Sequence, residues 1–144
     1  VARSMRGLAT GAATIAAGSL GTTLLVGTAS DVDAETLVDL VERSMSSPVF
    51  ELLKRPDELF VVEHAHLQPR FVEDSVRVAL KGLIDEVPGL GDGDFAFSRQ
   101  VNLETIHDHD VLAERWGTIG ELRAEIAGGD GARQTTLADW LTGP

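Results

Sequence analysis

The segment with the greatest capacity for chemistry is residues 102–110, which place two imidazoles and three carboxylates within nine positions. It follows residues 95–101, whose apolar and polar side chains alternate in the way typical of a half-buried strand. Imidazole and carboxylate groups bind divalent metals and transfer protons near neutral pH. On an extended chain His107 and His109 point the same way. The pattern predicts a metal or acid–base site, although a polar surface turn has the same composition.

Two helix starts carry further carboxylates beside cations. Lys54, Arg55, Asp57 and Glu58 surround a proline that opens one helix, and residues 71–74 place two acids in the first turn of another. Acidic side chains at a helix N-terminus interact favourably with the helix dipole, so a purely structural role explains both groups. The functional interpretation is a metal-binding Glu58 beside phosphate-binding cations.

The remaining histidines and tryptophans are interpreted as structural. His64 and His66 are two positions apart on a predicted helix, so they face different sides and do not form a ligand pair. Trp116 and Trp140 are expected to pack against other side chains rather than to stack on a ligand. These four residues are therefore left out of the candidate site.

The composition limits the classes of function. The chain has 144 residues, a formal net charge of −11, 43% hydrophobic residues and no cysteine. A core can form, but an acidic chain is unsuited to nucleic acid and to anionic membranes, which attract basic faces. Without cysteine there are no disulfides, so a cytoplasmic location is expected. The uncharged stretch 7–30 contains Gly11, Gly18 and Gly21, which disfavour a signal or membrane-spanning segment.

Hydrophobic periodicity predicts an α+β chain. Val72, Val76 and Leu80 recur at helical spacing, whereas uncharged β-branched runs indicate strands. Two strand pairs separated by helices predict an antiparallel sheet with helices on one face. The expected strands are 8–16, 20–29, 95–101 and 110–115, and the expected helices are about 33–45, 56–65, 69–87 and 119–127.

Several segments, in the same order, resemble the type IB GTP cyclohydrolases, a family that includes the archaeal enzyme of methanopterin synthesis. Agreement extends from about residue 21 to residue 126, and several long segments in correct order are more specific than any single one. The matching segments are 44–58, 69–74 with Val76 and Arg77, 102–107, 113–118 and 120–123.

The resemblance implies the tunnelling fold, an antiparallel four-stranded sheet with two main helices between two hairpins, packed on one face. Members of the family carry two such modules in one chain, and this chain resembles the C-terminal one. The implied organisation is an atypical N-terminal segment at 1–20, the tunnelling-fold module at 21–127 and a tail at 128–144. In that tail Leu137, Trp140 and Leu141 are expected to dock.

The resemblance also implies a reaction and its metal. The family opens the imidazole ring of GTP by hydrolysis, with formate release, towards dihydroneopterin phosphates for folate and pterin biosynthesis. Glu58, Glu104 and His107 fall at metal-site positions, with Glu104 and His107 as catalytic residues. The implied cofactor is a divalent metal, Zn, Mn or Fe, which supplies hydroxide at neutral pH.

Four further residues fall at substrate positions in the same resemblance. Glu73 matches the carboxylate that accepts hydrogen bonds from the N1–H and the 2-amino group of guanine, a charge-assisted and therefore strong pairing. Lys54, Arg55 and Arg70 are implied as contacts of the triphosphate. GTP is the expected substrate, in a homo-oligomer or in association with a cysteine-bearing N-terminal half, and no nucleic acid or membrane partner is expected.

The chain departs from the family pattern in two places. The family uses a cysteine metal ligand in its N-terminal half, and residues 17–21 replace a family motif that contains His and Arg. These losses predict little or no cyclohydrolase activity for the isolated chain. Two alternatives stay open. One is an inactive module of the same fold that binds a purine or pterin or assembles with a partner, and the other is the nitrile reductase of queuosine synthesis, which fits residues 54–58 and 71–74 less well.

Overall fold

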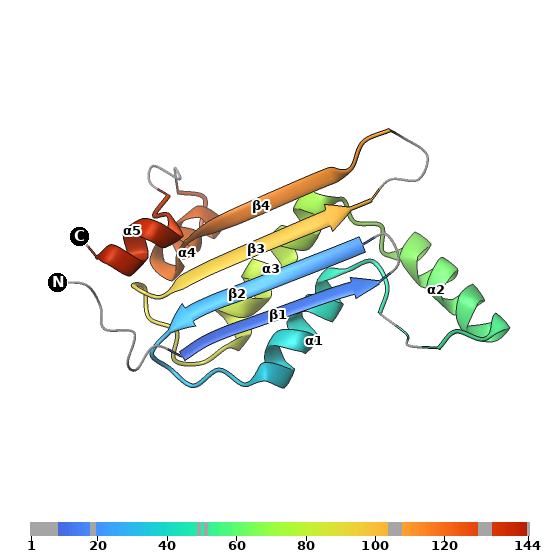
Figure 1. Cartoon of the computed structure of the whole chain (residues 1–144), viewed down its shortest axis with the longest axis horizontal. Coiled ribbons are helices and arrows are strands. Elements are labelled where there is room, and N and C mark those ends of the chain that lie inside the picture. The colour runs from blue at the N-terminus through green and yellow to red at the C-terminus, as the bar shows by residue number, and fades with distance from the viewer. Residues whose placement is uncertain are drawn as a thin grey trace.

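The described part of the chain forms an antiparallel sheet flanked by helices (Figure 1). The strands are β1 (Ala9–Ala17), β2 (Leu20–Thr28), β3 (Phe95–Asn102) and β4 (Val111–Thr118), paired in the order β1-β2-β3-β4. The predicted α+β class is confirmed. The computed structural model describes residues 9–17, 20–48, 50, 52–103, 108–129 and 134–143, with the backbone alone for 9–17 and 20.

Alternation along β2 and β3 decides which side chains enter the core. Val26 lies opposite Ala96 in the antiparallel register, and both are fully buried on the face that meets the helices. Leu25 and Phe97 also lie opposite each other but point to the other face, because neighbouring side chains alternate along a strand. The alternating pattern at 95–101 thus indicated this strand correctly.

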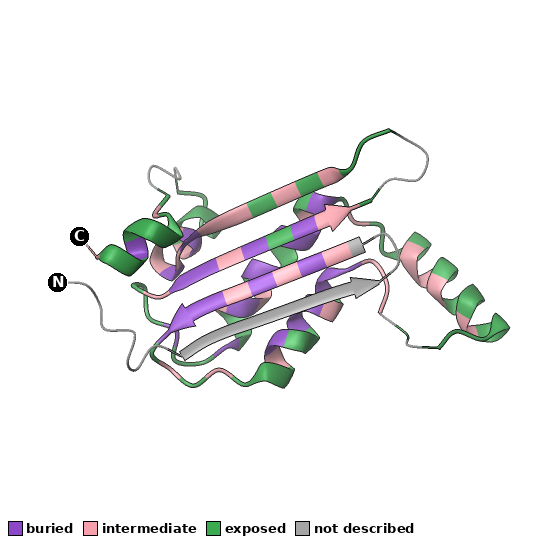
Figure 2. Ribbon diagram, viewed as in Figure 1, coloured by how far each residue is buried: buried purple, intermediate pink, exposed green. Residues whose placement is uncertain are grey.

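Helices α1 (Ala34–Ser44) and α3 (Val72–Glu86) cover one face of the sheet. Each has an apolar stripe, and Figure 2 shows buried residues along both helices. Asp33 begins α1 as its N-cap, accepting a hydrogen bond from the Thr36 backbone N–H at 3.0 Å. The residues that α1 and α3 contribute to the core cluster are Leu37, Leu40, Val41, Val76, Ala79, Leu80 and Leu83.

Helix α2 (Arg55–Leu67) is a third helix between the two hairpins, and it projects from the sheet in Figure 1. It contains no buried residue. Residues 59–62 place four consecutive apolar side chains around the helix, so no single apolar stripe forms. The helices between the two hairpins that pack on the sheet are therefore α1 and α3. None of the helices in the described ranges combines the length and the apolar character needed to cross a membrane.

The tail expected at 128–144 contains a helix, α5 (Leu137–Thr142), which follows α4 (Ile119–Ile126) in the chain. Thr136 is the N-cap of α5, and its side chain accepts a hydrogen bond from the Asp139 backbone N–H at 3.1 Å. In Figure 1, α5 lies close to the beginning of β3. This part of the chain therefore belongs to the folded unit.

Trp140 attaches α5 to the sheet face opposite α1 and α3. Its ring centroid is 5.7 Å from that of Phe95, and the side chain is buried. Gly27 lies opposite Phe95 and leaves space for the indole, because a Cβ at Gly27 would lie only 2.7 Å from the ring. The expected docking of Trp140 is confirmed, whereas Leu137 and Leu141 stay exposed.

Candidate functional site

Three sequence segments that carry the family resemblance meet where β3 ends. The end of α1, the start of α3 and the end of β3 are distant in the chain. They enclose a small polar cavity of about 30 Å³, a volume sufficient for one water molecule. The cavity is lined by Met45, Ser46, Arg70, Ser75, Gln100 and Asn102.

Arg70 joins the start of α3 to the end of α1. Its Nη1 donates hydrogen bonds to the carbonyl oxygens of Arg43 and Met45, the latter at 3.3 Å. These carbonyls belong to the last turn and the C-cap of α1, where no donor from the helix itself is available. A cation there also interacts favourably with the helix dipole. Arg70, predicted as a triphosphate contact, therefore also stabilises the end of α1.

Arg70 lines a second and larger cavity, of about 550 Å³, between the end of α1 and helix α2. That volume is within the range of small-molecule sites. Arg43, His64 and Gln68 also line it, and the sequence interpretation did not include them. The sequence held one signal, because His64 follows Phe60 by four residues, and the two rings stack at 5.3 Å.

An ion pair at the rim sets part of the electrostatics of this larger cavity. Arg43 Nη1 and Nη2 donate to the two carboxylate oxygens of Glu86 at 3.1 and 2.6 Å. The hydrogen bonds from Arg43 lower the pKa of Glu86, and the same hydrogen bonds raise the pKa of Arg43. Arg70 has no carboxylate partner among the described residues. Of the two arginines that line this cavity, Arg70 is therefore the one whose positive charge is not neutralised by a carboxylate.

Side-chain amides fix the end of β3. The Thr22 hydroxyl donates to Gln100 Oε1, and Gln100 Nε2 donates to Asn102 Oδ1 at 2.7 Å. Gln100 is buried, and paired polar groups in a low-dielectric interior hold one conformation. Asn102 precedes the segment that contains Glu104 and His107. Those two predicted catalytic and metal-binding residues lie outside the described part of the chain.

At both helix starts one acid acts as a cap and the other is left exposed. Asp57 accepts a hydrogen bond from the N-cap N–H of α2 at 3.0 Å, and Asp74 accepts one from the N-cap N–H of α3 at 3.1 Å. The structural interpretation therefore applies to these aspartates. Glu58 and Glu73 are exposed, and no residue in the described ranges forms a hydrogen bond or ion pair with either carboxylate.

The predicted site residues with described positions form two groups. Lys54, Arg55 and Glu58 lie at the exposed start of α2, the end that points away from the sheet in Figure 1. Arg70 and Glu73 lie beside the sheet at the start of α3. Among the described residues, no group of three or more His, Asp or Glu side chains could hold a metal ion. The single described chain therefore leaves Glu58 apart from Glu73 and Arg70.

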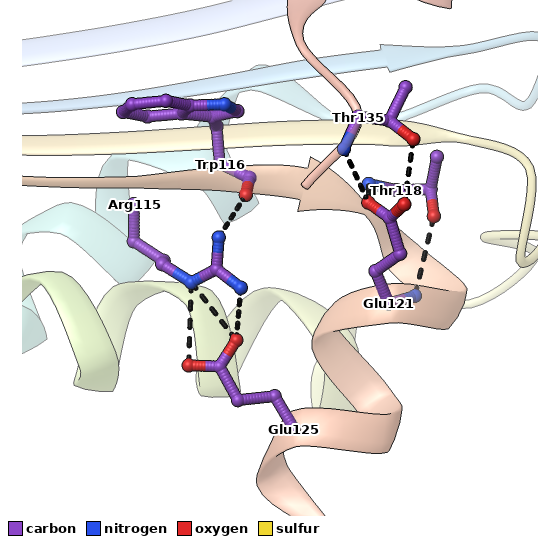
Figure 3. A network of polar contacts seen from close by, with 6 residues as sticks. All are labelled: Arg115, Trp116, Thr118, Glu121, Glu125 and Thr135. Atoms are coloured by element: carbon purple, nitrogen blue, oxygen red, sulfur yellow. Dashed lines mark hydrogen bonds and ion pairs between the residues drawn. The ribbon is translucent and has the colours of Figure 1, made fainter. Parts of the chain in front are cut away.

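The family-like segments near the C-terminus hold β4, α4 and the segment before α5 together (Figure 3). Arg115 Nε donates to Glu125 Oε2 at 3.0 Å, which ties β4 to α4. Glu121 Oε2 accepts the backbone N–H groups of Thr118 and Thr135 at 2.9 and 3.0 Å. Burial acts to raise the pKa of Glu121, but the hydrogen bonds from Thr135 and Thr118 outweigh burial and lower the pKa. Glu121 thus fastens the segment that leads into α5.

Similarity to known proteins extends over most of the chain. GTP cyclohydrolase MptA of Methanothermobacter thermautotrophicus is 52% identical over 101 residues, which are 70% of this chain and 32% of that protein. The proteins of that name from Methanosarcina acetivorans and Methanocaldococcus jannaschii are 49% and 41% identical, over 67% and 72% of this chain and 30% and 33% of theirs. The chain thus spans about a third of the length of the curated relatives it matches.

A family model described as type I GTP cyclohydrolase folE2 matches residues 11–113. The matched range includes all seven predicted site residues and ends within β4, so α4 and α5 lie beyond it. Because the match covers more than half of the chain, and identities to the relatives reach 52%, the chain belongs to the type I GTP cyclohydrolase folE2 family.

Proposed function

We propose that the chain is a tunnelling-fold module of a GTP cyclohydrolase, and that GTP binds where β3 ends. Arg70 carries this proposal, because it lines both the small polar cavity at the end of β3 and the larger cavity of about 550 Å³, whose volume is in the range of small-molecule sites. Polar groups from distant segments around a cavity are typical of a binding site. The reaction proposed for the assembled cytoplasmic enzyme is hydrolytic opening of the GTP imidazole ring, with formate release, towards dihydroneopterin phosphates for folate and pterin biosynthesis.

Glu73 is the proposed guanine anchor. Its exposed carboxylate has no internal partner in the described ranges, so both oxygens are available to the N1–H and the 2-amino group of guanine. Arg70 is the proposed triphosphate contact on this side of the site. Lys54 and Arg55 lie at the projecting end of α2, so they would serve a site completed by a second copy or by a cysteine-bearing half.

A divalent metal, Zn, Mn or Fe, enters the proposal through Glu58, Glu104 and His107. Glu58 has no further His or acid beside it that would complete a metal site in the described ranges, and the chain has no cysteine. The described residues therefore do not form the metal site by themselves. The chemistry that they support on their own is recognition of GTP.

Replacing Glu73 with glutamine is expected to weaken GTP binding at least tenfold, because an amide presents one acceptor oxygen and loses the charge-assisted pairing. Isothermal titration with GTP at defined Mn²⁺ or Zn²⁺ measures this change. ATP serves as the reference ligand, because adenine lacks the two-donor edge, and the preference for GTP over ATP should disappear in the variant. Glu63→Gln, another exposed acid, is the matched control and should leave the affinity unchanged. Equal GTP affinity in wild type and Glu73→Gln contradicts the assignment.

Little or no formate release is expected from the purified, metal-loaded chain supplied with GTP. The chain lacks the thiolate ligand of the family, and it spans about a third of its relatives. The same observations favour the alternative function, an inactive module that binds a purine or pterin or assembles with a partner. Formate measured after addition of a cysteine-bearing N-terminal half separates the two, because a catalytic module gains activity and an inactive one does not. Robust formate release from the chain alone would refute the prediction.

A further inference from the structure

The 550 Å³ cavity at the end of α1 is lined by several side chains that donate hydrogen bonds, among them Arg43, Arg70 and His64. Arg70 also lines the 30 Å³ cavity at the end of β3, which has space for one water molecule. Of these two cavities, only the one of 550 Å³ can therefore hold part of a nucleotide. Arg70 precedes the proposed guanine anchor, Glu73, by three positions, so a wall of this cavity and the anchor belong to the same short segment.

Arg43 lies between two cavities. The 550 Å³ cavity and a neighbouring cavity of about 220 Å³ share Arg43 and Val78, whereas Glu86 lines only the neighbouring one. The two carboxylate oxygens of Glu86 accept hydrogen bonds from Arg43 at 3.1 and 2.6 Å, so the guanidinium is directed towards Glu86. The Arg43 side chain thus has one partner in Glu86 and a place for another in the 550 Å³ cavity.

The ion pair that holds Arg43 is easily exchanged. The Arg43 side chain is 57% exposed and that of Glu86 is 45% exposed. An exposed ion pair contributes little to stability, because water screens it and two flexible side chains lose freedom. A phosphate group offers a guanidinium the same two parallel hydrogen bonds as a carboxylate does. A chain of phosphates in the 550 Å³ cavity would therefore compete with Glu86 for Arg43.

Two other donors of the cavity are held in place. Arg70 Nη1 donates to two carbonyl oxygens at the end of α1, which fixes the guanidinium there. The imidazole of His64 stacks on Phe60 with the ring centroids 5.3 Å apart, which fixes the ring in the cavity wall. These two groups are therefore in place before a ligand binds, whereas Arg43 is bound to Glu86.

The balance of charge in the cavity depends on Arg43. Glu42 is the one acid among the described lining residues, and its charge offsets that of Arg70. While Glu86 neutralises Arg43, the cavity has no excess of positive charge, in a chain whose formal net charge is −11. Release of Arg43 from Glu86 provides that excess, which an anion needs in order to bind against the field of the whole chain.

We propose that the 550 Å³ cavity receives the triphosphate of GTP, and that Glu86 limits the affinity by holding Arg43 until the phosphates displace it. The identity of the nucleotide rests on the proposed function. Arg70 and His64 contact the phosphates directly, and Arg43 joins them by exchanging its partner. Glu86 is then a positioning residue that lowers the affinity without contacting the nucleotide, so replacing Glu86 and replacing Arg43 should have opposite effects.

Isothermal titration of the full chain with inorganic tripolyphosphate, without added metal ion, measures this cavity separately from the guanine anchor. Glu86→Gln should strengthen binding about twofold to fivefold, because it releases Arg43. Arg43→Gln should weaken binding about fivefold to tenfold, and in that background Glu86→Gln should have no effect. His64→Phe keeps a ring to stack on Phe60 and removes the imidazole donor, so it should weaken binding about threefold.

Asp85→Asn is the matched control. It removes one negative charge from α3, as Glu86→Gln does, but Asp85 is paired with Lys81 and lines only the neighbouring cavity. The affinity for tripolyphosphate should therefore not change, and circular dichroism verifies that each variant folds. An equal gain in both variants overturns the proposal, as does a gain from Glu86→Gln that persists without Arg43, because overall charge then explains it. Absence of tripolyphosphate binding also overturns the proposal.

Guanosine and GTP separate this inference from the proposed function. The affinity for guanosine should depend on Glu73 but not on Glu86, whereas the affinity for GTP should depend on both. If guanosine binding requires Glu73 while GTP and tripolyphosphate do not respond to Glu86→Gln, the inference fails and the proposed function stands. If tripolyphosphate responds as expected while Glu73→Gln leaves the GTP affinity unchanged, the cavity binds polyphosphate and the proposed function is the part that fails.

Discussion

Replacing Trp140 with alanine is expected to lower the free energy of unfolding by about 3–5 kcal/mol, the range for truncating a buried tryptophan. The indole is 8% exposed, packs on Phe95 and donates to the Gly93 carbonyl oxygen at 2.7 Å. Its removal uncovers Phe95 and leaves that carbonyl without its donor. Urea unfolding, followed by far-ultraviolet circular dichroism, measures the loss.

Three variants separate packing from the hydrogen bond at this position. Trp140→Phe retains a ring and loses the donor, so it should cost about 1–2 kcal/mol, and Leu141→Ala, at a more exposed neighbour, less than about 1 kcal/mol. Gly27→Ala should destabilise the wild type, because the added Cβ would lie 2.7 Å from the indole. In the Trp140→Ala background the same change should be harmless. Additive effects of Gly27→Ala and Trp140→Ala would show that α5 does not dock on β2.

The helices and strands that form the core could be predicted from the sequence because the patterns that indicate them are local. The stripe of Val76, Leu80 and Leu83 lies within one helix, and the alternation at 95–101 lies within one strand. Such periodicities report which side of an element is buried without reference to the rest of the chain. The predicted start of a helix was wrong where a cap determines it. α3 begins at Val72 rather than at the expected residue 69, since Asp74 accepts a hydrogen bond from the backbone N–H of the residue just before Val72.

The attachment of α5 could not be predicted with the same certainty, because it depends on contacts across the chain. Trp140 fits against the sheet only because Gly27, more than a hundred residues earlier, has no side chain. A six-residue helix is also too short to show a periodicity. Sequence reasoning could name Trp140 as a residue that docks but not the surface that receives it.

The candidate site, too, has features that local sequence patterns indicate and features that only the structure shows. Acids at a helix start are visible in sequence, yet only the structure shows that Asp57 and Asp74 are the caps and that Glu58 and Glu73 are left over. The contact of Arg70 with the end of α1 joins segments 25 or more residues apart, which no local pattern reports. Arg43 and Gln68 were missed for the same reason, whereas His64 had a local signal in its spacing from Phe60.

Replacing Glu121 with alanine is expected to destabilise the chain by about 2–3 kcal/mol, the loss of a capping interaction together with hydrogen bonds to a charged group. Its carboxylate accepts from the Thr118 N–H at 2.9 Å and from the N–H and hydroxyl of Thr135 at 3.0 and 2.7 Å. Without these bonds both the start of α4 and the segment before α5 lose their anchor. Glu125→Ala, on the same helix and paired with Arg115 near the surface, is the control and should cost less than about 1 kcal/mol.

The pH dependence of Glu121→Gln distinguishes a charged anchor from a neutral one. The pKa of Glu121 is lowered in the folded chain relative to its ordinary value of 4.5, since the hydrogen bonds outweigh burial. A lowered folded-state pKa means that the stabilisation is complete above pH 4.5 and is lost as the pH falls through the folded value. The stability difference between wild type and Glu121→Gln, from urea unfolding at pH 7 to 3, should therefore shrink below pH 4.5. A difference that grows on acidification would mean that burial dominates and that the anchor is a neutral acid.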